Sequence, residues 1–87
     1  MNSTKLIFEK VGDIRSTYPY ICIYDEHDRV NPFMDIGITD DKQVQYILYA
    51  SKRNIVLSNE DWSLIQNKAL EFLPKALADE ESEARRN

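Results

Sequence analysis

The chain has little of what enzymes and metalloproteins use for their chemistry. Its 87 residues include one cysteine, one histidine and two glycines. Cys22 alone rules out a disulfide within the chain and cannot build a cysteine zinc site. The isolated Gly12 and Gly37 form no phosphate-binding loop, and neither a nucleophile elbow nor an HExxH pattern is present. We therefore expect no enzymatic activity, no cofactor and no metal ion.

Long apolar segments are absent too. The apolar runs are too short to cross a bilayer, and Met1 to Lys5 lacks the basic start and apolar run of a signal peptide. These absences predict a cytoplasmic protein with no membrane partner. Eighty-seven residues suffice for one domain with an adequate but small core.

Basic residues are outnumbered, 11 to 15, which gives a net charge of −4. This balance disfavours nucleic acid as a direct partner, because phosphate binding requires clustered cations. Between Asp25 and Asp61 there are eight acids and four bases, a bias that can steer a basic partner. Any single acid here is better explained as part of a solvated loop.

Cys22 and the run Asp25-Glu26-His27-Asp28 have plain structural interpretations. No histidine or cation near Cys22 in sequence would lower its pKa, so we expect a small buried hydrophobic side chain on a strand. The acidic run could bind a divalent ion weakly, but its spacing does not match a calcium loop. A solvated turn is the better interpretation.

Alternation of apolar and polar residues predicts four strands, with Thr39 to Lys42 as a hairpin turn between the last two. The expected strands are 5–9, 18–24, 33–38 and 44–49. Residues 54–57 are either a last edge strand or an extended approach to the helix that follows.

A helix is predicted from Ser58 onward. Ser58 is a good N-cap, and Glu60 and Asp61 fall in the first turn, where the helix dipole favours anions and Asp61 imitates a capping box. One apolar stripe follows at three- and four-residue steps: Trp62, Ile65, Ala69, Phe72 and Leu73. Pro74 either kinks this helix or opens a second one. The expected domain is 1–78, and 79–87 is a charged tail, frayed or disordered.

This order of elements predicts an α+β fold: an antiparallel four- to five-stranded meander with a C-terminal helix packed on one face. Eight side chains should face the helix: Ile21, Ile23, Met34, Ile36, Ile38, Val44, Tyr46 and Leu48. Phe33, Asp35 and Gly37 alternate with the apolar residues of their strand and should lie on the other face.

The uncovered face of such a sheet would be rich in phenols, amides and carboxylates, which is typical of a recognition surface. With the acidic loop beside it, the predicted partner-binding set is Tyr18, Tyr20, Tyr24, Asp25, Glu26, Asp28, Asp35, Gln45 and Tyr49. Two alternatives stay open. A loop or the N-terminal segment could cover the tyrosines, or a register shift of one residue could exchange the faces.

Four segments together resemble small immunity proteins of bacterial toxin systems, notably those of contact-dependent growth inhibition. They are 31–38, 44–49, 54–62 and 71–77, and the likeness lies in size, acidity and the order of strands and helix. The resemblance implies a protein of the bacterial cytosol that binds a cognate toxin domain and blocks its active or binding surface. Many such toxins are basic nucleases, commonly acting on transfer RNA, and an acidic inhibitor fits them.

A second hypothesis comes from another class. The chain could be a structural or regulatory subunit, such as a homodimer that pairs through its tyrosine-rich face or an edge strand. A phage-encoded inhibitor of a host nucleic-acid enzyme is a third possibility, because an acidic chain would suit such a partner for the same reason as in the first hypothesis.

Overall fold

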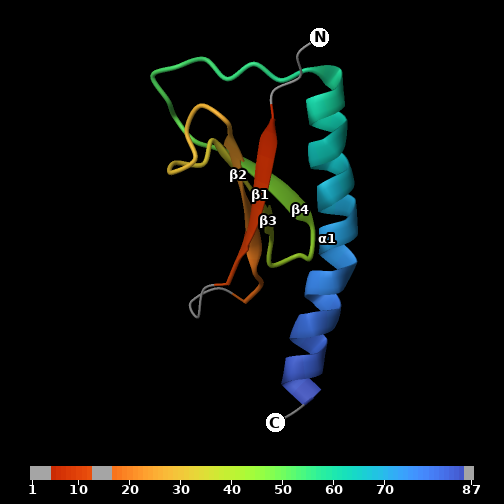
Figure 1. Ribbon diagram of the computed structural model, residues 1–87. Coiled ribbons are helices and arrows are strands. Elements are labelled where there is room, and N and C mark those ends of the chain that lie inside the picture. Colours follow the sequence, from red (N-terminus) through yellow and green to blue (C-terminus); the bar gives the residue numbers. More distant parts are fainter. Residues whose placement is uncertain (1–4, 13–16, 86–87) are drawn as a thin grey trace.

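The computed structural model describes residues 5–12 and 17–85, with side chains up to residue 79. Four strands form one antiparallel sheet in sequence order, and one long helix follows (Figure 1). The elements are β1 (Leu6–Val11), β2 (Tyr20–Asp25), β3 (Met34–Ile38), β4 (Val44–Leu48) and α1 (Asn59–Arg85). The predicted α+β meander with a C-terminal helix is confirmed.

The strand ends follow from local chemistry. Pro19 has no N–H for a sheet ladder, and β2 begins directly after it, two residues later than expected. The predicted hairpin turn between β3 and β4 is confirmed: Lys42 N donates to Thr39 O at 2.9 Å, and Thr39 N donates to Gln43 O at 2.8 Å. Lys42 takes a left-handed φ of 66° to close this turn.

The segment between β4 and α1 forms no fifth strand. Residues 49–58 run as coil from the end of the sheet to the start of the helix (Figure 1). Ile55 and Leu57 pack against the core from this segment. Of the two sequence alternatives for 54–57, the extended approach to the helix is therefore the observed one.

The helix begins with a complete capping box. Asp61 N donates to Ser58 Oγ at 3.0 Å, and Ser58 N donates to Asp61 Oδ2 at 3.0 Å, so each residue satisfies a free N–H of the other. The helix then runs through Pro74 without a break. Pro74 and Leu70 are both exposed, so water can reach the Leu70 carbonyl that loses its helical donor.

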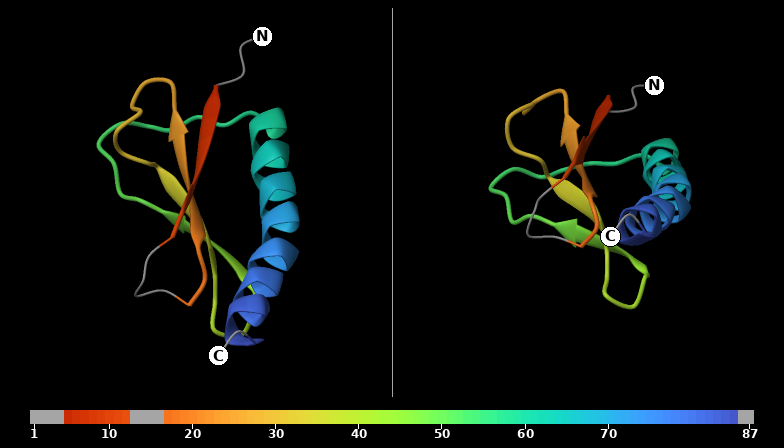
Figure 2. Two further views of the ribbon diagram at one scale, coloured as in Figure 1. Left: turned by 60° about the horizontal axis from the view of Figure 1, so that its bottom comes forward. Right: turned by 90° about the horizontal axis from the view of Figure 1, so that it is seen from below.

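The core lies between one face of the sheet and one stripe of α1 (Figure 2). Its buried members are Ile21, Ile23, Phe33, Met34, Ile36, Ile65, Ala69, Phe72 and Ala76. The predicted stripe is thus confirmed at Ile65, Ala69 and Phe72. Trp62 instead lies at the margin, 39% exposed, with its ring 5.7 Å from that of Tyr46.

Phe33 departs from the predicted division of the faces, and Leu48 keeps its predicted face but is not buried there. Phe33 belongs to the core rather than to the far face, because it precedes β3 and is not bound by the alternation of that strand. Leu48 pairs with Met34 and so lies on the helix side, as expected, but it is 69% exposed. It ends the outermost strand, where neither sheet nor helix covers it.

The helix is longer than the sheet that it covers. Its 27 residues span about 40 Å, whereas strands of five or six residues span about 20 Å. Figure 1 shows the C-terminal turns extending past the sheet. The last core residue on α1 is Ala76, and the helix continues to Arg85, past the predicted domain boundary at residue 78. No described helix is long and apolar enough to cross a membrane.

Candidate protein-binding face

The pairing register builds a continuous row of side chains across the sheet face opposite α1, which we call the open face. Glu9 pairs with Cys22, Cys22 with Asp35, and Asp35 with Ile47, and residues directly opposite each other share a face. Strand residues on the open face are Ile7, Glu9, Val11, Tyr20, Cys22, Tyr24, Asp35, Gly37, Gln45 and Ile47. The predicted register is therefore confirmed for Tyr20, Tyr24, Asp35 and Gln45.

Asp35 stands at the centre of the open face and is only half satisfied. Its side chain is 6% exposed, and the Tyr49 hydroxyl donates to its Oδ2. The hydrogen bond to Asp35, with burial, raises the pKa of Tyr49 to about 12. Oδ1 is buried and has no hydrogen-bond partner among the described residues. This oxygen can accept a hydrogen bond from a ligand that enters beside it.

Cys22 lies in the row between Glu9 and Asp35 and is buried, as predicted. The pKa of the Cys22 thiol is raised to about 11, mainly by burial and secondly by the neighbouring Asp35 carboxylate. The thiol therefore stays protonated at neutral pH, which suits a packing role better than a nucleophilic one.

A pocket of about 420 Å³ opens at one end of the open face. Its lining comes from the approach to β2, from β3 and β4, and from the hairpin turn between them: Thr17, Tyr18, Pro19, Tyr20, Asp35, Gly37, Ile38, Asp40, Gln45 and Ile47. Four predicted partner-binding residues, Tyr18, Tyr20, Asp35 and Gln45, thus meet in one place. Among these described residues there are two carboxylates and no basic side chain.

Tyr24 belongs to the same face but not to the pocket. Its hydroxyl donates to Glu9 Oε1 on β1 at 2.9 Å. This hydrogen bond, with a smaller contribution from burial, raises the pKa of Tyr24 to about 12. A phenol and a carboxylate therefore form a polar pair on the β1 side of the open face.

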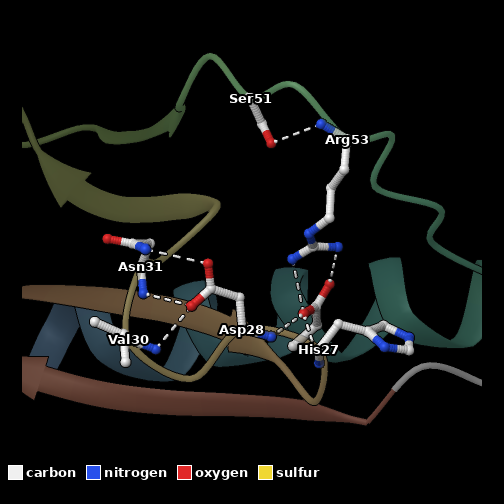
Figure 3. A network of polar contacts seen from close by, with 7 residues as sticks. His27, Asp28, Val30, Asn31, Ser51 and Arg53 are labelled. Carbon is white, nitrogen blue, oxygen red and sulfur yellow. Dashed lines mark hydrogen bonds and ion pairs between the residues drawn. The ribbon is translucent and has the colours of Figure 1, made fainter.

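Asp25 ends β2 and holds the loop that joins β2 to β3, together with the Arg53 side chain that Figure 3 shows reaching toward this loop. Asp25 is 2% exposed and accepts two hydrogen bonds from Arg53, each 2.9 Å long, besides those from His27 N and Asp28 N. Burial alone would raise the pKa of Asp25, but the Arg53 guanidinium and the two N–H groups outweigh it and lower the pKa below its ordinary value.

Asp28 organises the rest of that loop. It accepts hydrogen bonds from Val30 N and from Asn31 N and Nδ2 (Figure 3), and these donors, led by Asn31 N, lower its pKa. Glu26 and His27 are exposed. No cluster of three or more potential metal ligands occurs among the described residues.

Several residues of the site were not in the predicted binding set. Among them, Ile47 and Asp40 line the pocket, and Glu9 accepts the hydrogen bond from the Tyr24 hydroxyl. The alternation of 44–49 already placed Ile47 on the face of Gln45 and Tyr49. Asp40 lies in a turn, and the partner of Glu9 depends on how β1 registers with β2, so no local pattern marks either residue.

In comparisons with known proteins, no family model, no curated protein and no solved structure matched this chain. What the site can do is therefore inferred from its own residues.

Proposed function

We propose that this chain is a non-catalytic immunity protein of the bacterial cytoplasm, which binds a basic toxin domain through its open face and occludes the toxin's active or binding surface. The observation that supports this most is the acidic, tyrosine-lined pocket on the side of the sheet that α1 does not cover.

The pocket has the chemistry to receive a lysine or arginine side chain. Asp35 offers a buried oxygen without a described donor, and Asp40 adds an exposed carboxylate at the rim. A charge-assisted hydrogen bond to such a carboxylate is stronger than one between neutral groups. Tyr18 and Tyr20 supply ring faces that attract a cation.

The charge of the whole molecule supports the same partner. At −4 the chain attracts a basic domain over roughly the Debye length, about 8 Å at physiological ionic strength. A nuclease toxin, including one that acts on transfer RNA, needs a cationic surface to hold its substrate. An acidic protein seated on that surface blocks it without any chemistry of its own.

The direct test is neutralisation in cells. The proposal predicts that a large exported protein with a variable C-terminal domain is encoded immediately upstream, and the chain is co-expressed with that domain. Growth should be restored by the wild-type chain and by Asp41→Lys, but less well by Asp40→Lys. Asp40 lines the pocket, whereas its neighbour Asp41 does not, and both are exposed. No rescue by the wild-type chain, or equal rescue by both variants, would contradict the proposal.

A further inference from the structure

The two lateral edges of the sheet differ in chemistry. The edge at β1 carries the exposed, charged Glu9 and Lys10, which discourage pairing with another strand. The opposite edge, at β4, has no charged residue between Val44 and Leu48. Proteins usually protect a free edge with charge, proline or a bulge, and β4 has neither charge nor proline.

The backbone of β4 offers a regular set of free pairing groups. Thr39 N donates to Gln43 O, and Tyr49 N donates to Phe33 O. Odd-numbered residues therefore direct their N–H and C=O groups toward β3. By the alternation of an antiparallel ladder, Val44, Tyr46 and Leu48 direct theirs outward.

Apolar side chains of β4 are exposed on both faces of the sheet. Ile47 is 41% exposed on the open face, and Tyr46 and Leu48 are 39% and 69% exposed on the helix side. The strand thus combines outward backbone groups, which have no hydrogen-bond partner among the described residues, with apolar surface above and below them, which is the composition of an interface core.

The helix presents the same contrast between its two flanks. Lys68 lies over the Phe8 ring on the β1 side, and Trp62 contacts Tyr46 on the β4 side. Trp62 is 39% exposed. The β4 side of the molecule therefore carries exposed apolar surface both on the strand and at the start of the helix.

We propose that a second copy of this chain pairs with the β4 edge, antiparallel across a two-fold axis at Tyr46. Val44 then lies opposite Leu48 of the other copy, and the outward backbone groups of both strands are satisfied. The two sheets become one continuous sheet, and Trp62 of each copy lies on its covered side, beside the paired strands.

A second copy fits this edge better than an unrelated strand for two reasons. A neutral strand paired with itself places no like charges opposite each other. A two-fold axis also brings the apolar side chains on each face of β4 next to the same side chains of the other copy. A strand pair alone buries little surface. The exposed Trp62 and Leu48 add apolar contact surface beside the strands.

Sedimentation velocity of the full chain over a wide concentration range tests this directly. The wild type should form dimers, and Leu48→Lys should weaken dimerisation by at least about tenfold. Val30→Lys is the matched control, because it adds the same charge at an exposed apolar residue in the loop before β3. It should leave the dimer unchanged.

Amide hydrogen exchange supplies a second measurement that is independent of the variants. The Tyr46 and Leu48 amides should be protected in the wild-type dimer and exchange fast in the Leu48→Lys monomer. A chain that stays monomeric at every soluble concentration overturns the proposal and leaves the edge to a strand of another protein. A dimer that resists Leu48→Lys, with fast exchange at Tyr46, overturns it as well.

Discussion

At the scale of single residues, the protein treats its two buried sheet carboxylates differently. Asp25 is fully engaged, with Arg53 and two backbone N–H groups as donors. Asp35 has the Tyr49 hydroxyl on one oxygen, and its other oxygen has no hydrogen-bond partner among the described residues. A satisfied buried carboxylate stabilises a fold, whereas a half-satisfied one costs free energy unless a ligand completes it. Asp25 therefore holds the loop, and Asp35 is the carboxylate on which the proposed binding rests.

The first prediction concerns Asp25. Asp25→Ala should lower the free energy of unfolding by about 1–3 kcal/mol at neutral pH, because three groups lose their acceptor. Glu26→Ala, at the exposed neighbouring position, should change it little. Urea melts measure both, and equal stability of the two variants would mean that the Arg53 pair does not hold the loop.

The pairing of Asp25 with Arg53 should also make the stability of the fold depend on pH. The folded pKa of Asp25 lies below its ordinary value of 3.8. Its stabilisation is therefore present above 3.8 and is lost as the pH falls through the folded pKa. The wild type should lose more stability than Asp25→Ala when urea melts are repeated at increasingly acidic pH. Parallel losses would show that Asp25 is not shifted in the folded state.

At the scale of the element, α1 is held by its buried stripe rather than by its whole length. Phe72→Ala should lower the free energy of unfolding by about 3–5 kcal/mol, a large part of the roughly 5–15 available to a small domain. Trp62→Ala should cost less, because Trp62 is 39% exposed and Phe72 only 6%. Denaturant melts rank the two, and a larger loss at Trp62 would mean that the helix is rotated about its axis.

The C-terminal turns give a further prediction. Removing residues 79–87 should leave the thermal midpoint almost unchanged, because the last core residue on the helix is Ala76. The truncation removes the ion pair between Lys10 and Asp79, which is 3.8 Å long and solvent-exposed at both ends, and such pairs contribute little. A large fall in the midpoint would show that these turns dock on the sheet.

The sequence predicted the elements because their signals are local. Alternation marks β3 and β4, and Ser58 with Asp61 marks the start of α1. The C-terminal end of the helix was harder to predict from the sequence. Residues 79–85 have no apolar stripe, yet they are mostly residues that favour helix once one has formed.

The candidate site was predictable only in part. Alternation places Tyr20, Asp35 and Gln45 on one face without knowledge of the fold. The role of Asp25 could not be foreseen, because its partner Arg53 lies 28 residues away. A long-range ion pair leaves no periodic trace in the sequence, so Asp25 looked like any other acid of a surface loop.

At the scale of the whole molecule, one helix covers one face of a four-stranded sheet and leaves the other face uncovered (Figure 2). The β4 edge and the pocket adjoin, because Gln45 and Ile47 belong both to the strand and to the pocket lining. Pairing at β4 would place two open faces side by side on one surface. Each copy would then keep its own acidic pocket.

The measurement that tests the central claim most directly is the binding of the toxin domain to two charge-reversal variants. Asp40→Lys and Asp41→Lys change the net charge equally, so long-range steering is weakened equally in both. The proposal predicts that Asp40→Lys also speeds dissociation and weakens affinity by at least about tenfold relative to Asp41→Lys. If both folded variants bind with the same dissociation rate as the wild type, the pocket on the open face is not the binding site.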